Sequence, residues 1–435
     1  MTAVRHRRYS SQMIVRARTV VTIDGAPIEN GAVAVSGNRI VDVGRFAEIK
    51  TRNAGKTVDL GEKVLLPGLI NAHCHLDYTC LRGKIPPQKS FTNWIQAINA
   101  EKANLLPKDY VASINDGFAE ASRFGTITIA NLTAFPELIS QIQPPIRTRW
   151  FAELIDVRMP ESATELVDRA MESLGRARPE LVLSEAEGGA PLGLAPHALF
   201  TASSNLFRWC ENISRRDNIL LTTHLAESRE EMEMFRHASG PLYEFLKSIG
   251  RPMNDCGNET PLGLFVGALP STSLRTGSGR ALPQWVVAHL NELTESDFEL
   301  LEKSNARFHI VHCPRSHKYF GHSPFAFDRL RSFDFNICLG TDSLASNESL
   351  SLFAEMRAFQ KEFPSVSAEE IFQMVTVNPA RALRYGNALG QIGPGFGADL
   401  IAVPCSTSTD IFEQILAFEN PVDWVLAGND QGQML

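Results

Sequence analysis

Short apolar runs alternate with longer amphipathic stretches from about residue 68 to residue 385. Apolar runs of about four to eight residues predict buried strands, and the longer stretches predict helices. Strands are expected at 69–75, 126–131, 149–155, 192–197, 219–224, 285–289, 307–312 and 336–342, and helices at 110–124, 161–174, 350–363 and 368–385. This alternation is typical of a parallel sheet built from βα units, so we predict an α/β fold with a (β/α)8 barrel of the TIM type.

The two ends of the chain have a different pattern, in which short β-rich runs are separated by turns. Strands of this kind are expected at 13–15, 19–23, 31–35, 39–43, 399–403 and 423–427. We expect a small antiparallel unit, a composite β-sandwich domain of residues 1–67 and 386–435, beside a barrel of residues 68–385. The connection 228–284, with a Gly/Ser/Thr-rich stretch at 271–280, is long for one βα link and predicts a lid or an insertion.

The composition is that of a globular protein, with 44% hydrophobic and 21% charged residues. The 42 Lys and Arg against 49 Asp and Glu give a net charge of −7, so nucleic acid is not an expected partner. No apolar run approaches the roughly 18 residues of a membrane span, and none follows the basic N-terminus as a signal peptide requires. The expected partner is a small-molecule substrate, and a homodimer is expected of an acidic barrel.

The seven cysteines are widely spaced, and no two of them form a Cys-x-x-Cys pair. The odd number and the spacing argue against a disulfide framework and against a cysteine-based structural zinc site. This use of cysteine fits a reducing compartment, and we expect a cytoplasmic protein.

Candidate chemistry gathers at the ends of the expected strands. Five of the eight strands end in histidine and the last ends in aspartate, although the chain has only 11 histidines. These residues are His75, His197, His224, His289, His312 and Asp342. In a barrel of this type the active site lies at the C-terminal ends of the strands, so the pattern predicts that these side chains share one site.

Four of the strand-end side chains can share a metal ion. His73 and His75 alternate along one strand and therefore point to the same side, and His224 and Asp342 can reach the same point from two other strands. Three imidazoles and a carboxylate leave room for water, as catalytic zinc requires, and the ion supplies hydroxide at neutral pH. Zinc is the expected ion, although the same ligands accept iron or manganese. Each element alone also has a structural explanation, such as an aspartate that caps a helix.

Several segments resemble the amidohydrolase superfamily, in the branch that holds cytosine, guanine and adenosylhomocysteine deaminases and triazine hydrolases. They are Leu-Pro-Gly-Leu-Ile-Asn-Ala-His-Cys-His at 66–75, His-Leu-Ala-Glu at 224–227, Val-His-Cys-Pro-Arg-Ser at 311–316 and Leu-Gly-Thr-Asp-Ser-Leu-Ala-Ser-Asn at 339–347. The resemblance extends from about residue 13 to about residue 428. It implies that His73, His75, His224 and Asp342 ligate a single metal, because strand four ends in His197 where binuclear relatives have a bridging lysine.

The resemblance also implies catalytic roles. Glu227 matches the residue that moves a proton to a ring nitrogen, His289 matches the histidine that orients the attacking water, and Asp342 serves as the base. His197 matches a position that often contacts substrate. His317 stands where relatives often have asparagine, so His317 or the nearby His322 could contact the substrate or could be a solvated loop residue.

Two aromatic residues follow the first expected strand. Phe91 and Trp94 are expected to be exposed on the loop after that strand, where they cover a substrate ring or pack the barrel mouth.

These residues predict a metal-dependent deaminase of an aminated heterocycle, with a purine or purine-nucleoside-like base favoured. Hydroxide on the metal would attack the ring carbon and ammonia would leave. The alternative keeps the site and changes the bond, to a cyclic amide or to a C–Cl or C–N bond on a triazine-like ring. A non-catalytic scaffold on the same fold is the third hypothesis.

Overall fold

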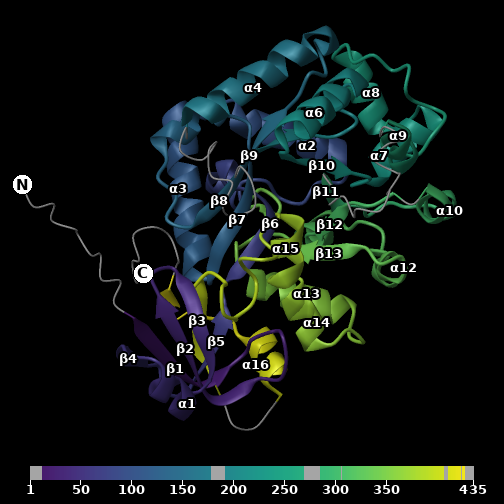
Figure 1. Cartoon of the computed structure of the whole chain (residues 1–435). Coiled ribbons are helices and arrows are strands. Elements are labelled where there is room, and N and C mark those ends of the chain that lie inside the picture. Colours follow the sequence, from purple (N-terminus) through teal and green to yellow (C-terminus); the bar gives the residue numbers. More distant parts are fainter. Residues whose placement is uncertain are drawn as a thin grey trace, which may run out of the picture.

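The computed structural model describes residues 12–177, 192–268, 285–304, 306–405, 410–422 and 424–426. Its larger sheet has nine strands, in the order β13-β12-β11-β10-β9-β8-β7-β6-β14 (Figure 1). They are β6 (Leu69–His75), β7 (Thr126–Thr133), β8 (Arg147–Leu154), β9 (Leu192–Pro196), β10 (Leu220–Leu225), β11 (Trp285–His289), β12 (His309–His312), β13 (Asn336–Leu339) and β14 (Asp342–Ser343). Every neighbouring pair is parallel, which confirms the predicted α/β class.

The last expected strand, 336–342, is divided into β13 and β14. β13 pairs with β12 and β14 pairs with β6, so the two parts reach opposite edges of the curled sheet. This arrangement is consistent with a TIM-type barrel. At the break, the amide of Gly340 donates to the carbonyl of His312 at 3.0 Å, and the amide of Thr341 donates to the carbonyl of His73 at 3.1 Å.

Gly340 is packed so closely that a larger residue has no room. A Cβ atom there would lie 2.8 Å from the carbonyl oxygen of His73 and 2.9 Å from Cγ1 of Val311. We therefore expect Gly340→Ala to lower the free energy of unfolding by about 1–3 kcal/mol, as overpacking of a core does. Urea unfolding measures this, with Gly175→Ala as the control, because a Cβ at Gly175 would meet nothing within 4 Å. An unchanged midpoint for Gly340→Ala would contradict the close packing.

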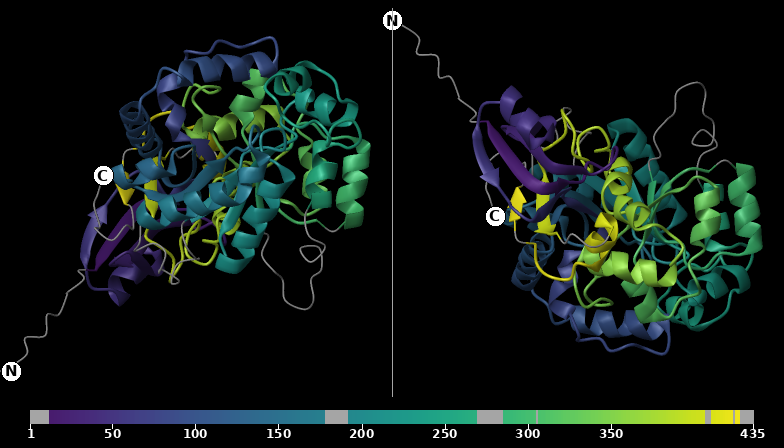
Figure 2. Two further views of the ribbon diagram at one scale, coloured as in Figure 1. Left: turned by 90° about the horizontal axis from the view of Figure 1, so that it is seen from above. Right: turned by 90° about the horizontal axis from the view of Figure 1, so that it is seen from below.

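Helices surround the strands, as Figure 2 shows from above and below. They include α2 (Phe91–Lys102), α3 (Pro107–Arg123), α4 (Ala163–Ala177), α6 (Ser204–Asp217), α7 (Arg229–His237), α8 (Pro241–Ser248), α9 (Pro261–Ala268), α10 (Glu295–Ser304), α11 (Pro314–Phe320), α12 (Phe327–Ser332), α13 (Leu352–Glu362), α14 (Ala368–Gln373) and α15 (Val377–Ala382). The short 3-10 helices are η1 (Leu76–Leu81), η2 (Pro136–Gln141) and η3 (Pro160–Ser162). Buried apolar side chains of strands and helices form the largest core cluster, with Leu69, Phe118 and Trp285 among its members. No helix of the described ranges combines the length and apolar character that crossing a membrane demands.

The predicted helix 368–385 and the long connection 228–284 each contain more than one helix. The stretch 368–385 is not one helix but two, α14 and α15. Pro379 is the reason, because proline lacks an amide hydrogen and fits the first turn of α15 but not a helix interior. The long connection 228–284 contains α7, α8 and α9, while its Gly/Ser/Thr-rich stretch 271–280 lies outside the described residues.

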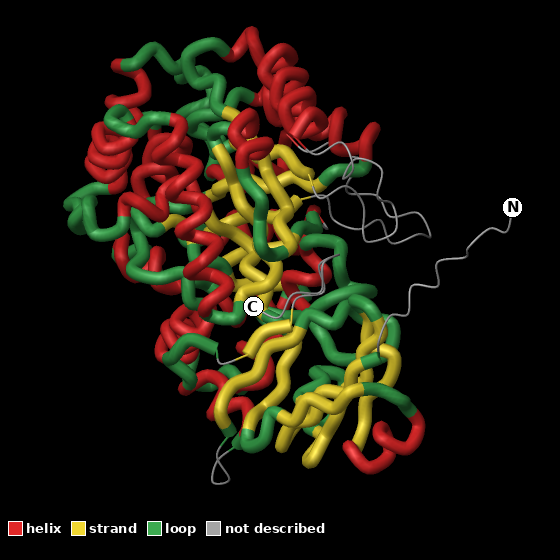
Figure 3. The backbone as a smooth tube through the Cα atoms, turned by 90° about the vertical axis from the view of Figure 1, so that its left-hand side faces the viewer, coloured by secondary structure: helices red, strands yellow, loops and turns green. Residues whose placement is uncertain are grey.

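The smaller sheet takes strands from both ends of the chain, as expected. Its order is β16-β15-β5-β1-β2-β3, with β4 paired to β1, and Figure 3 shows it beside the larger sheet. The elements are β1 (Met13–Val20), β2 (Ile28–Ser36), β3 (Arg39–Arg45), α1 (Phe46–Arg52), β4 (Lys56–Asp59), β5 (Lys63–Pro67), β15 (Leu400–Pro404), α16 (Ile411–Ala417) and β16 (Trp424–Leu426).

The expectation of a purely antiparallel unit is wrong, because β1 runs parallel to both β4 and β5. The crossover through α1 makes this possible, since it returns the chain in the same direction. The β-sandwich itself stays a prediction. The sheet is tied closely to the barrel, because only Gly68 separates β5 from β6.

Candidate metal centre and active site

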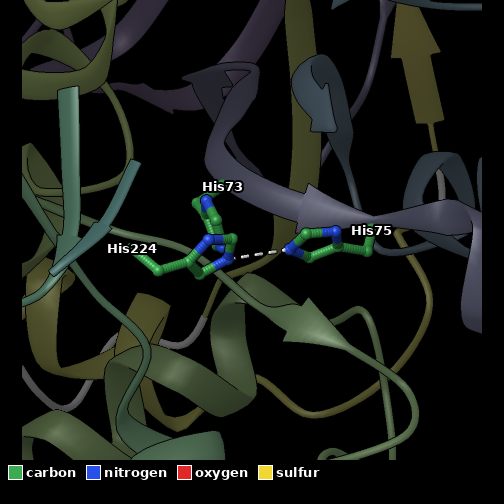
Figure 4. Close-up of side chains that lie close together, drawn as sticks. All are labelled: His73, His75 and His224. Atoms are coloured by element: carbon green, nitrogen blue, oxygen red, sulfur yellow. Dashed lines mark hydrogen bonds between the residues drawn. The ribbon is translucent and has the colours of Figure 1, made fainter. Parts of the chain in front are cut away.

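Three imidazoles meet at the C-terminal ends of β6 and β10 (Figure 4). Nε2 of His75 lies 3.1 Å from Nε2 of His224, and the ring of His73 lies 5.1 Å and 4.9 Å from theirs. All three side chains are buried, and each offers a nitrogen within 4.8 Å of the others. Neither ring nitrogen of His73 has a hydrogen-bond partner among the described residues. Buried polar atoms are costly without a partner, so this arrangement fits a bound cation.

Asp342 faces the same histidines from β14. Its Oδ1 lies 3.9 Å from Nε2 of His73 and 3.9 Å from Nε2 of His75. Its Oδ2 accepts hydrogen bonds from the hydroxyls of Ser316 at 2.6 Å and Ser346 at 3.3 Å. The backbone φ of Asp342 is 56°, a value that residues other than glycine rarely adopt. The surrounding hydrogen bonds therefore fix Oδ1 toward the histidines.

The protonation states suit a divalent ion. Burial, together with the nearby His224, lowers the pKa of His73 to about 3, and burial lowers the pKa of His75 well below its ordinary value. Both imidazoles are therefore neutral at pH 7, which is the form that binds metal. Three imidazoles and one carboxylate are ligands that catalytic zinc accepts. We conclude that the four side chains fit one divalent cation.

A second cluster adjoins the first and contains Glu227, His289 and Asp342, whose ligand atoms also lie within 4.8 Å of one another. Oε1 of Glu227 lies 3.7 Å from Nε2 of His289. Burial and the negative charges of Asp342 and Glu231 raise the pKa of Glu227 well above its ordinary value. Glu227 therefore keeps a proton at a pH where an exposed glutamate has lost it, which suits a proton donor.

Glu231 holds the segment that carries Glu227, a role that the sequence analysis missed. Its carboxylate accepts hydrogen bonds from the amides of Ala226 at 3.2 Å and Glu227 at 2.7 Å. Ser228 caps α7 by accepting from the amide of Glu231 at 3.1 Å. The Ser-x-x-Glu pattern at 228–231 is a capping-box motif and could have revealed this contact.

His197 lies beside His224 and contacts it through its backbone carbonyl. The carbonyl of His197 accepts from the amide of His224 at 2.8 Å and from Nδ1 of His224 at 2.9 Å. Nδ1 of His197 lies 2.7 Å from the hydroxyl of Thr201. This carbonyl fixes the ring of His224 with Nε2 toward the centre. The predicted contact between the His197 ring and a substrate stays a prediction.

His317 is buried and supports the Glu227 segment indirectly. Its Nδ1 lies 3.0 Å from Oδ1 of Asn291, and the amide group of Asn291 donates to the carbonyl of Glu227 at 3.1 Å. Its predicted role in binding substrate is untested. His312, a further strand-end histidine, belongs to neither cluster, because its ring stacks on Phe325 at 4.1 Å and 7°.

The expectation that Phe91 and Trp94 are exposed on a loop is wrong. Both lie in the first turn of α2, which Ser90 caps by accepting from the amide of Asn93. Phe91 is 8% exposed and Trp94 packs against the barrel core. Their rings stack at 6.0 Å and 18°, and the ring of Phe320 meets Trp94 edge-on at 5.0 Å.

The aromatic cluster of Phe91, Trp94 and Phe320 is connected to the candidate metal centre through other aromatic rings. The ring of Phe200 lies 6.3 Å from Phe91 and 5.8 Å from His197. On the other side, His322 lies 5.1 Å from Phe320 and 5.5 Å from His317. A continuous series of ring contacts therefore connects the first turn of α2 with the histidines of the candidate site.

Known proteins are similar to this chain in sequence and in fold. The 5-methylthioadenosine/S-adenosylhomocysteine deaminase of Pyrococcus furiosus is 27% identical over 406 residues, which cover 90% of this chain and 86% of the relative. The crystal structure of Helicobacter pylori aminofutalosine deaminase, in complex with methylthio-coformycin, superposes with a TM-score of 0.80 at 19% identity and covers 97% of this chain and 100% of that one.

An adenosine deaminase from Xanthomonas campestris with bound zinc gives a TM-score of 0.77 at 22% identity, covering 96% of this chain and 92% of that one. The model of the amidohydrolase family matches residues 64–427, which include both clusters of the candidate site. The chain therefore belongs to the amidohydrolase family.

Proposed function

We propose that this chain is a metal-dependent hydrolase that removes the exocyclic amino group from the adenine ring of a nucleoside-like substrate and releases ammonia. The observation that carries the proposal is the adjacency of two clusters, one able to hold a cation and one able to exchange protons. Family membership supports hydrolysis of a carbon–nitrogen bond other than a peptide bond. The name of the Pyrococcus relative supports an adenine nucleoside as the substrate.

His73, His75, His224 and Asp342 would hold the ion. With a divalent cation held there, a water molecule would be acidic enough to provide hydroxide near neutral pH. Asp342 accepts the proton that the attacking water loses, while Ser316 and Ser346 keep its Oδ2 in place. Asp342 then gives that proton to the departing amino group, which leaves as ammonia, while the proton still on the attacking oxygen passes to Glu227 and restores its acid form.

Glu227 and His289 act on the substrate side. Glu227 donates its proton to the ring nitrogen next to the carbon under attack, so that negative charge does not build up on the ring. Nε2 of His289 is buried without a hydrogen-bond partner among the described residues and is free to bind the attacking oxygen. The aromatic cluster of Phe91, Trp94 and Phe320, which Phe200 connects to His197, favours a planar ring as part of the substrate.

The test is ammonia release from zinc-loaded protein. We expect turnover of 5′-methylthioadenosine, S-adenosylhomocysteine and 5′-deoxyadenosine with kcat/KM of at least about 10⁴ M⁻¹s⁻¹, the lower end of enzyme values. Cyclic amides and chlorotriazines serve as comparison substrates, and turnover of these in place of adenine nucleosides would favour the alternative hydrolase. Protein with one equivalent of zinc that releases no ammonia from any aminated heterocycle would contradict the proposal.

A further inference from the structure

A buried carboxylate lies next to the metal centre, in a place that the proposed mechanism does not use. Glu153 is in β8, one residue before the end of that strand, and its side chain is 5% exposed. Its Oε1 lies 3.7 Å from Nδ1 of His75. Nδ1 is the ring nitrogen on the far side from the centre, because Nε2 of His75 faces His224 and Asp342.

The carboxylate of Glu153 has little electrostatic compensation from ion pairs among the described residues. Within the described ranges, Nδ1 of His75 is the one ion-pair partner that the carboxylate has. A buried carboxylate is stable only when it is paired with a positive group or hydrogen-bonded. The separation of 3.7 Å exceeds a hydrogen bond, so the contact with a neutral imidazole is weak. A cation bound to Nε2 would draw electrons from the ring and make the Nδ1 hydrogen a stronger donor to Glu153.

The packing of His75 fixes the plane of its ring but not the orientation or the tautomer of the ring. The His75 ring is nearly parallel to the rings of His224, at 5.2 Å and 19°, and Tyr78, at 5.9 Å and 20°. Stacking fixes the plane of the ring but does not determine which nitrogen points to the centre or which one carries the hydrogen. A carboxylate beside Nδ1 determines both, because it favours hydrogen on Nδ1 and leaves the lone pair on Nε2.

From these contacts we infer that Glu153 is a positioning residue of the metal centre, which holds His75 with Nε2 toward the ion and strengthens ion binding by its negative charge. The inference rests on the proposed metal site. His224 provides an internal comparison, because its Nδ1 donates to a neutral acceptor, the carbonyl of His197, at 2.9 Å. Of the two groups that contact Nδ1 of a ligand histidine, Glu153 is charged and the carbonyl of His197 is not. Removal of the Glu153 charge should therefore lower the affinity for the ion without removing a ligand.

The experiment compares zinc affinity in the full-length wild type and in Glu153→Gln, by competition with a chromophoric chelator. Glutamine has the same shape and can still accept a hydrogen bond, but it carries no charge. We expect the Kd for zinc to rise about 10- to 100-fold, as for other outer contacts of metal ligands. The melting temperature of the metal-free protein should not fall, because the carboxylate is poorly compensated without the ion, and the absorption spectrum of the cobalt-loaded protein should shift.

Glu211→Gln is the matched control. The side chain of Glu211 is 4% exposed, and its Oε1 accepts from Nε1 of Trp285 at 2.9 Å. Trp285 is the first residue of β11, at the opposite end of that strand from His289. This variant also loses a buried carboxylate, and it should bind zinc as the wild type does.

Equal zinc affinity in Glu153→Gln and the wild type would overturn the inference and leave the proposed function standing, since the wild type would still bind zinc. An unchanged affinity with a raised KM would also overturn it, because Glu153 would then contact the substrate. If the wild type itself binds no zinc, the proposed function fails, and the inference fails with it.

Discussion

Replacement of Glu227 by glutamine is expected to lower kcat by about two to four orders of magnitude, the usual contribution of a general acid or base. Glutamine can occupy the same space beside His289 but cannot deliver a proton to the substrate ring. The zinc content should stay the same, because Glu227 is not one of the four proposed ligands His73, His75, His224 and Asp342. Steady-state kinetics and metal analysis of the same sample measure both effects.

Glu299→Gln is the control for this variant, because Glu299 is 64% exposed and pairs with Lys303 on the surface of α10. It should have the activity of the wild type. If Glu227→Gln instead lost its zinc, Glu227 would be a ligand and the assignment of the two clusters would be wrong. If Glu227→Gln kept full activity, proton delivery by Glu227 would be excluded.

Loss of one imidazole should have an even larger effect. We expect His224→Ala to bind no stoichiometric zinc and to lose at least about 10⁴-fold in kcat/KM, because the pKa of water without a metal stays far above neutrality. Addition of zinc should restore activity to chelator-treated wild type but not to this variant. Zinc at about 1,000 times its Kd should raise the free energy of unfolding of the wild type by about 4 kcal/mol, and the variant should lack this gain.

His237→Ala tests whether the effect is specific. His237 is an exposed residue near the end of α7, outside both clusters, so its removal should change neither zinc binding nor activity. A His224→Ala protein that still carries one equivalent of zinc and turns over substrate would show that the ion, if present, lies elsewhere.

Much of the barrel can be predicted from the sequence for a simple physical reason. β6 and β7 are buried along their whole length, and neither contains an Asp, Glu, Lys or Arg residue, as is typical of parallel strands that are covered on both faces. The C-terminal ends of such strands meet at one face, which is why His75, His224 and Asp342 could be grouped in advance. The break at Gly340 could not be predicted, because it depends on contacts with His73 that only the closed arrangement creates.

The direction of the strands in the smaller sheet also could not be predicted from the sequence. An apolar pattern shows which face of a strand is buried but not which strand lies beside it, so the parallel pairing of β1 with β4 and β5 was missed. Glu153 was missed for a related reason, since a lone carboxylate in an apolar run acquires meaning only when His75 lies next to it. The contact between Ser228 and Glu231, by contrast, could be predicted from the Ser-x-x-Glu spacing alone.

The seam between the first and the last barrel strands has a consequence for assembly. Asp342 lies opposite Cys74 at this seam, next to both histidines of β6. A ribosome-bound chain that has emerged only as far as Thr341 has His73, His75 and His224 but lacks the carboxylate of Asp342. The proposed ion would therefore gain its fourth ligand only when β14 pairs with β6. Its full binding energy would stabilise the closed barrel and not an earlier folding intermediate.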